Sequence, residues 1–164
     1  PLGSRHPAAA PFQAFQGNDK YFVVALLTEE RKVWHRFCES IGRFDLLEDP
    51  KFLDNALRVG NVEELAKTLQ QTFSTQPAAH WLSVFAEAKI PCGPVNNIKD
   101  VTDDPQIRHR KMLTSIRNKS GKIWTVANTP FKFSKAVTGP KGASPTLGEH
   151  TQEILTKFKR NDNL

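Results

Sequence analysis

Residues 90–97 constrain the backbone more narrowly than any other stretch of this 164-residue chain. They read Ile-Pro-Cys-Gly-Pro-Val-Asn-Asn, with two prolines and one glycine among eight mostly uncharged residues. Proline fixes φ near −65° and favours extended geometry in the preceding residue, whereas glycine adopts φ values that other residues avoid. The pattern by itself favours a rigid connector that leads from a helix into the next element.

The first third of the chain combines strand and helix patterns. Residues 5–19 lack a helical apolar stripe and are expected to form an extended arm, and residues 21–27 are typical of a buried strand. Thr28 is a candidate helix cap, with Glu29 and Glu30 in the first turn, where carboxylates meet the positive end of the helix dipole. The helix that follows should end at Gly42 and bury one apolar face, made of Val33, Trp34, Phe37, Cys38 and Ile41.

Further helices are predicted between residues 43 and 89. Residues 43–58 should form brief helical turns, and residues 61–73 and 77–89 a helical hairpin. Asn61, with Glu64 three residues later, resembles a capping box, and Pro77 is tolerated in a first helical turn.

Beyond residue 97 the predicted elements are shorter. Residues 98–101 and 105–110 should be helical, residues 112–117 and 122–126 should form a β-hairpin around the turn 118–121, and residues 131–134 are a candidate third strand. Residues 149–159 should form a last helix. The expected fold class is therefore α+β, with a small antiparallel sheet of about three strands packed with several helices.

The pattern also divides the chain into regions. Residues 1–4 resemble the scar of a cleaved expression tag, residues 5–134 should form one small α+β domain, residues 135–146 a linker rich in Gly, Pro, Ser and Lys, and residues 147–164 a helical tail.

Composition excludes several classes of protein. There is no apolar run of about 18 residues, and the mean hydropathy is −0.47, which argues against a membrane protein. Cys38 and Cys92 lack companions at metal-ligand spacing, so we expect no metal site and favour two free thiols, although a disulfide stays open. The net charge of +6 is typical of chains that meet anions, but the basic residues are spread out, which disfavours nucleic acid as a partner.

Five segments occur in an order that matches a known family. In chain order they are Arg-His-Pro at 5–7 leading to Pro-Phe-Gln-Ala-Phe at 11–15, Asp-Pro-Lys-Phe at 49–52 followed by Asn55 and Arg58-Val59, the run 90–97, Thr-Pro-Phe-Lys-Phe-Ser at 129–134, and Leu-Gly-Glu-His-Thr-Gln-Glu-Ile-Leu at 147–155. Together they resemble the smaller domain and C-terminal tail of family III CoA-transferases, a superfamily that includes formyl-CoA, carnitine and dicarboxylate CoA-transferases and 2-methylacyl-CoA racemases.

The resemblance implies that the chemistry belongs to another part of the protein. In this family the nucleophilic aspartate and most CoA contacts lie in a larger domain that would precede Arg5, so we expect no catalytic residue in this chain and no turnover by it alone. It implies no bound cofactor, with a coenzyme A thioester as substrate of the full-length enzyme. Glu29 and Glu30 are the candidate cleft-facing residues: they could relay protons or discriminate against acidic substrates, or they could only stabilise the first turn of their helix.

The implied partners are the large domain of the same chain, a second copy in an interlocked homodimer, an acyl-CoA and a carboxylic acid. The expected compartment is cytoplasmic or mitochondrial. Two alternatives stay open at this point: a fragment of a 2-methylacyl-CoA racemase, and a basic module that binds protein or nucleic acid.

Overall fold

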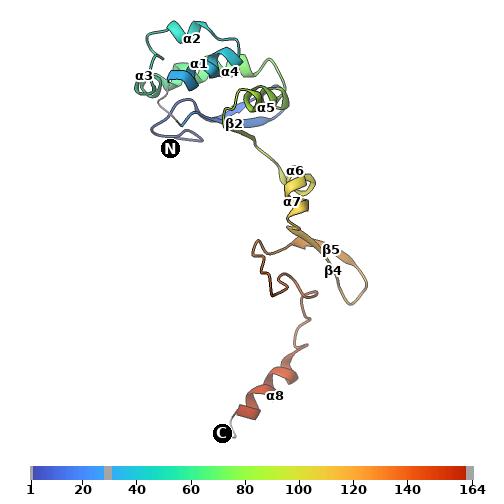
Figure 1. Ribbon diagram of the computed structural model, residues 1–164. Coiled ribbons are helices and arrows are strands. Elements are labelled where there is room, and N and C mark those ends of the chain that lie inside the picture. Colours follow the sequence, from blue (N-terminus) through green and yellow to red (C-terminus); the bar gives the residue numbers. More distant parts are fainter. Residues whose placement is uncertain (1, 28–30, 162–164) are drawn as a thin grey trace. The chain divides into compact units, whose positions relative to one another are not determined.

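The computed structural model describes residues 2–27 and 31–161. The chain divides into two compact units, Pro1–Val95 and Asn96–Leu164 (Figure 1). The division expected from the sequence, with one domain over 5–134, a linker over 135–146 and a tail over 147–164, stays a prediction. Each unit is described by itself.

The first unit contains a three-stranded antiparallel sheet in the order β1-β2-β3. Its strands are β1 (Phe12–Gln16), β2 (Tyr21–Ala25) and β3 (Cys92–Pro94). Phe15 pairs with Phe22, and Val24 pairs with Cys92. The α+β fold class is confirmed.

Two of these strands were not predicted. The arm expected over 5–19 contains β1, and the run 90–97, expected only as a connector, supplies β3. The prolines are compatible with β3 because this strand lies at the edge of the sheet. A residue without an N–H group can be placed there without removing a hydrogen bond between strands. The extended geometry that proline imposes therefore serves strand pairing as well as connection.

Five helices accompany this sheet in the described part of the first unit. They are α1 (Arg31–Ser40), α2 (Asp45–Glu48), α3 (Asn55–Gly60), α4 (Val62–Phe73) and α5 (Ala78–Glu87), close to the predicted positions. Gly42, with φ of 68°, follows α1 as predicted, in the left-handed conformation that glycine tolerates.

The predicted capping of α4 is wrong. The Asn61 side chain makes no cap hydrogen bond to α4; its amide instead donates to the carbonyl of Leu57, in the preceding helix, at 2.9 Å. Because α3 ends where α4 begins, satisfying the last carbonyls of α3 competes with capping α4. A sequence pattern contains no information about that competition.

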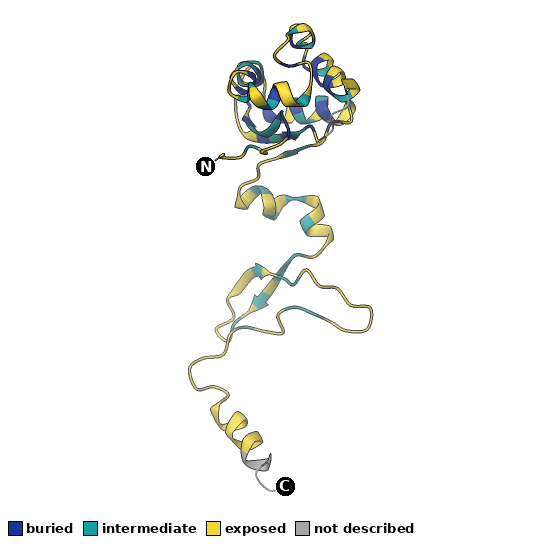
Figure 2. Cartoon of the chain, turned by 90° about the vertical axis from the view of Figure 1, so that its left-hand side faces the viewer, coloured by how far each residue is buried: buried dark blue, intermediate teal, exposed yellow. Residues whose placement is uncertain are grey.

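Aromatic side chains form the centre of the core. Phe73 makes edge contacts with Phe22 and Phe85 at centroid distances of 5.2 and 5.9 Å, and Phe37 stacks on Phe85 at 5.6 Å. Trp81 donates its ring N–H to the Phe73 carbonyl at 2.8 Å. The predicted inward positions of Trp34 and Trp81 are confirmed, and Figure 2 shows the buried residues gathered in this unit.

The second unit consists of short elements. They are α6 (Ile98–Asp103), α7 (Pro105–His109), β4 (Leu113–Arg117), β5 (Ile123–Ala127) and α8 (Thr151–Asn161). The predicted hairpin is confirmed, but β4 and β5 form their own two-stranded sheet, with Ile116 paired to Trp124.

Two features of the second unit follow from its thin packing. The candidate strand over 131–134 is wrong: these residues form no strand, and Phe131 and Phe133 are exposed. Across described residues 96–158, not one side chain is buried.

Among the described helices, none is long and apolar enough to cross a membrane.

Candidate functional site

The two candidate cleft residues, Glu29 and Glu30, lie outside the described residues. Arg31, the next residue, lines a cavity of about 230 Å³ at the start of α1, together with Trp34, His35, Leu47, Glu48 and Leu53. The lining therefore combines basic, acidic and apolar side chains. The role of Glu29 and Glu30 in substrate recognition stays a prediction.

Residues from two of the five family-like segments meet in the first unit. Asn55 spans the N-terminal arm: its amide donates to the Ala8 carbonyl at 2.8 Å and its oxygen accepts from the Ala10 N–H at 3.1 Å. Arg5 donates to the Glu63 carboxylate of α4 at 2.9 Å. These contacts fasten the arm to α3 and α4, so the resemblance in this region has a structural basis.

Arg58 is the buried charge at the centre of this region. Its side chain donates to the carbonyls of Ala10 at 2.8 Å and Phe52 at 3.1 Å, and the guanidinium lies 4.6 Å from the centroid of the Trp34 ring. It is 2% exposed and makes no ion pair with a described residue of the chain. Burial lowers the pKa of Arg58 from its ordinary value. Two carbonyls and an aromatic face thus take the place of a carboxylate partner.

The thiols offer no nucleophile. Both cysteines are free, as predicted. Burial raises the pKa of Cys38 to about 12, and burial also raises the pKa of Cys92. Because the thiolate is the reactive form, neither thiol has the lowered pKa that marks a catalytic cysteine.

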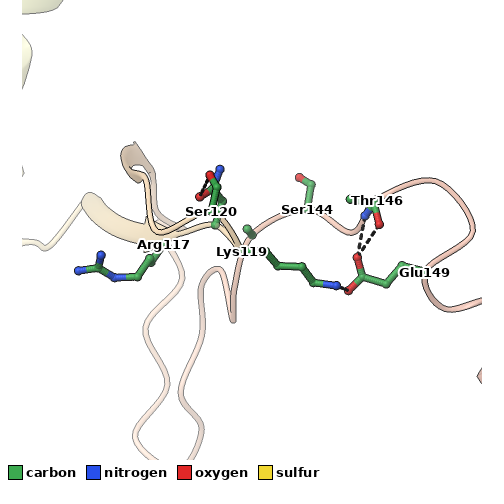
Figure 3. Close-up of a pocket in the computed structure, with 8 residues that line it drawn as sticks. Arg117, Lys119, Ser120, Ser144, Thr146 and Glu149 are labelled. Atoms are coloured by element: carbon green, nitrogen blue, oxygen red, sulfur yellow. Dashed lines mark hydrogen bonds and ion pairs between the residues drawn. The ribbon is translucent and has the colours of Figure 1, made fainter.

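A hollow in the second unit surrounds Glu149 (Figure 3). It measures about 430 Å³ and is lined by Arg117, Asn118, Lys119, Ser120, Ala143, Ser144, Thr146 and Glu149. One carboxylate oxygen of Glu149 lies 2.8 Å from the Lys119 Nζ. The other accepts from the Thr146 N–H at 2.8 Å and from its hydroxyl at 3.0 Å. We call Lys119, Thr146 and Glu149 the Glu149 clamp.

The contacts of the Glu149 clamp indicate a structural role and not a catalytic one. Hydrogen bonding from Lys119, followed by that from Thr146, lowers the pKa of Glu149 to about 2. A carboxylate that is held ionised and fully engaged is a poor general base. His150 lies 3.7 Å from the same carboxylate and directly precedes α8, so its surroundings are those of a helix end.

Arg58 and Asp19 have roles that the sequence does not reveal. Arg58 stands in a family-like segment, but a lone arginine before a valine gives no sign of burial. Asp19 accepts a hydrogen bond from the Ala78 N–H at 2.8 Å and so caps α5 from the β1–β2 turn, 59 residues away in the chain. Within 2–27 and 31–161, no group of three or more His, Cys, Asp and Glu side chains could hold a metal ion.

Curated relatives and a family model place this chain with CoA-transferases, and a solved structure shares its fold. The chain is 32% identical to succinyl-CoA:glutarate CoA-transferase of Mus musculus over 161 residues, which is 98% of this chain and 36% of that protein. It is 38% identical to acetyl-CoA:oxalate CoA-transferase of Acetobacter aceti over 133 residues, or 81% of this chain and 32% of that protein. The chain thus spans about a third of the length of these relatives.

A solved structure agrees with these relatives. The chain superposes on a CAIB/BAIF family protein from Brucella suis with a TM-score of 0.80 and 29% identity, covering 94% of this chain and 39% of that one. The family model of CoA-transferase family III matches residues 1–151, nearly the whole chain. The chain belongs to CoA-transferase family III.

Proposed function

We propose that this chain is the small domain and C-terminal tail of an acyl-CoA:carboxylate CoA-transferase. In the full protein it closes over an active site whose nucleophilic aspartate lies outside residues 1–164, and it contributes to a homodimer. By itself it does not catalyse transfer. The acceptor is a carboxylic acid and the donor an acyl-CoA.

The exposed apolar side chains of the second unit are the observation that carries this proposal. They include Ile123, Trp124, Phe131, Phe133, Val137 and Leu147. Because no side chain is buried in its described part, this unit gains little stability from apolar burial and leaves these side chains exposed. These residues are therefore suited to cover another surface, which supports a role in closing over a larger domain.

The relatives support transferase chemistry in preference to the alternatives. The proteins from Mus musculus and Acetobacter aceti are named for CoA transfer to a dicarboxylic acid. No contact within the described residues favours racemisation, and the ion pairs that engage several basic residues reduce the free positive charge that a nucleic-acid partner would need.

A transfer assay with trapping of the intermediate tests the proposal. The 164-residue chain is incubated with succinyl-CoA and either glutarate or oxalate, and the longer protein that contains it is assayed in parallel. We expect transfer only by the longer protein. Mass spectrometry of that protein after reaction with the acyl-CoA should place the covalent adduct on an aspartate outside residues 1–164. Turnover by the chain alone, or an adduct within it, would contradict the proposal.

A further inference from the structure

Four basic side chains surround another hollow of the second unit. It measures about 230 Å³ and is lined by His109, Arg110, Lys111 and Lys132. The first three lie at the end of α7, and Lys132 lies in the segment that follows β5. The hollow therefore joins two stretches that are about twenty residues apart in the chain.

Hydrogen bonds to backbone carbonyls hold the two stretches together. Arg110 donates to the Pro130 carbonyl at 3.2 Å. Asn128 donates from its side chain to the Lys111 carbonyl at 3.0 Å and from its N–H to the Met112 carbonyl at 2.7 Å. These hydrogen bonds thus hold the segment that contains Lys132 beside the consecutive residues 109–111.

Lys111 occupies a position where glycine is normally favoured. Its φ is 51°, in the left-handed region, and the N–H of Met112 donates to the Ile107 carbonyl at 3.0 Å to close the end of α7. Side chains other than glycine are disfavoured at such a helix end. The Asn128 side chain, which donates to the Lys111 carbonyl, helps to hold this conformation.

The cluster has no acidic counterpart. Within the described chain, His109, Arg110, Lys111 and Lys132 form no ion pair with a carboxylate, whereas the adjacent Arg108 pairs with Asp103 at 2.8 Å. Lysine and arginine side chains are hydrogen-bond donors only. Several donors that face one hollow suit an anion with several acceptor oxygens.

We propose that this cluster binds a phosphate group of a small-molecule anion. The tetrahedral oxygens of phosphate can accept from Arg110, Lys111 and Lys132 at once, which a planar carboxylate does less well. The proposal stands apart from the transfer chemistry and does not depend on it. Coenzyme A and free diphosphate both carry the required group.

The test is an NMR titration of the 164-residue chain with inorganic diphosphate at fixed ionic strength. We expect shifts at the amides of residues 109–112 and 132, and an affinity at least about tenfold weaker in Lys111→Gly and in Lys132→Ala, as expected for the loss of a charge-assisted hydrogen bond. Lys111→Gly suits the backbone conformation, so weaker binding there reports the lost charge.

Two control variants separate this result from general effects of charge and backbone. Lys89→Gly removes a lysine from another left-handed helix end, where φ is 54°, and Lys141→Ala removes an exposed lysine outside the hollow. Both should bind diphosphate like the parent chain. Equal weakening in all four variants, or absence of the cross-strand amide contacts of β4 and β5, would overturn the proposal.

The identity of the anion is decided by further titrations. Tighter binding of coenzyme A than of diphosphate, with the same sensitivity to Lys111→Gly, would assign the site to the coenzyme, and equal binding would assign it to free phosphates. Succinate that binds as well as diphosphate, or duplex DNA that displaces diphosphate with a steep salt dependence, would contradict a small-molecule phosphate site.

Discussion

At the scale of single residues, Arg58 does more for this fold than its place in the sequence suggests. One buried guanidinium joins the N-terminal arm, through Ala10, to the turn before α3, through Phe52. The same group covers the face of Trp34. Since a buried charge without its partners is costly, the arm and the turn stabilise each other through this residue.

Replacing Arg58 with methionine should lower the free energy of unfolding by roughly 2–4 kcal/mol. Two buried carbonyls would lose their donors, although the variant would escape the cost of burying a charge. Urea unfolding followed by circular dichroism measures the change. Arg36→Met on the exposed face of α1 is the matched control and should stay within about 0.5 kcal/mol of the parent. An equal loss of unfolding free energy in both variants would contradict a special role of Arg58 in stability.

A glycine is required where the β1–β2 turn approaches α5. A Cβ at Gly17 would lie 2.6 Å from the Ala78 nitrogen, closer than such atoms can approach. Gly17→Ala should therefore destabilise the chain by about 1–3 kcal/mol. At Gly60 a Cβ would meet nothing within 4 Å, and alanine there should be neutral or stabilising by up to about 1 kcal/mol. Thermal unfolding of the two variants distinguishes close contact from a general effect of adding a methyl group.

At the scale of elements, a contact from a distant segment completes the helix α5. The N-terminus of α5 follows Pro77, which supplies no side-chain cap. The Asp19 carboxylate, in the β1–β2 turn, caps the helix instead by accepting a hydrogen bond from the Ala78 N–H. This hydrogen bond from Ala78 is the first cause of the lowered pKa of Asp19. The β1–β2 turn and α5 therefore stabilise each other, and a substitution that disturbs one of them should also disturb the other.

The Glu149 clamp should respond to acid in a defined window. The pKa of Glu149 is about 2 in the folded chain and 4.5 ordinarily, so its contribution is fully present above pH 4.5 and is lost as the pH falls through about 2. The Thr146 amide chemical shift, followed from pH 6 to about pH 1, should keep its folded value at pH 4.5 and change with a midpoint near pH 2. Glu149→Gln should abolish this transition. A midpoint near 4.5 in the parent chain would show that the clamp is not formed.

At the scale of the whole molecule, burial is distributed very unequally. The first unit contains every side chain that is buried in the described chain (Figure 2). The second unit contains a hairpin, short helices and exposed aromatic residues. Stability that depends on apolar burial should reside in residues 1–95. The second unit is then the part that contributes least to that stability.

A chain that ends at Val95 should unfold with nearly the same free energy as the 164-residue chain, within about 1 kcal/mol. The reason is that the strand β3 and every buried residue of the described chain are retained. Urea unfolding monitored at far-ultraviolet wavelengths provides the comparison. A loss of several kcal/mol on removing residues 96–164 would mean that the second unit supports the first, contrary to the distribution of burial.

Local patterns were sufficient for most helices and for the β4–β5 hairpin. The apolar spacing in α1, α4 and α5 and the turn at 118–121 are properties of neighbouring residues, and each was confirmed. Family membership was also readable, because the order of five short segments is a property of the sequence itself. Glu29 and Glu30 stay predictions.

Tertiary structure alone decided which strands share a sheet and which polar groups are buried. Strands β1 and β3 exist because β2 offers an edge on each side, which no pattern within either segment encodes. Arg58 is buried because carbonyls from two other segments surround it, and Asn61 does not cap α4 because α3 ends beside it. Strand pairing and the burial of polar groups depend on contacts between segments that are far apart in the chain. Such contacts exist only once the chain has folded.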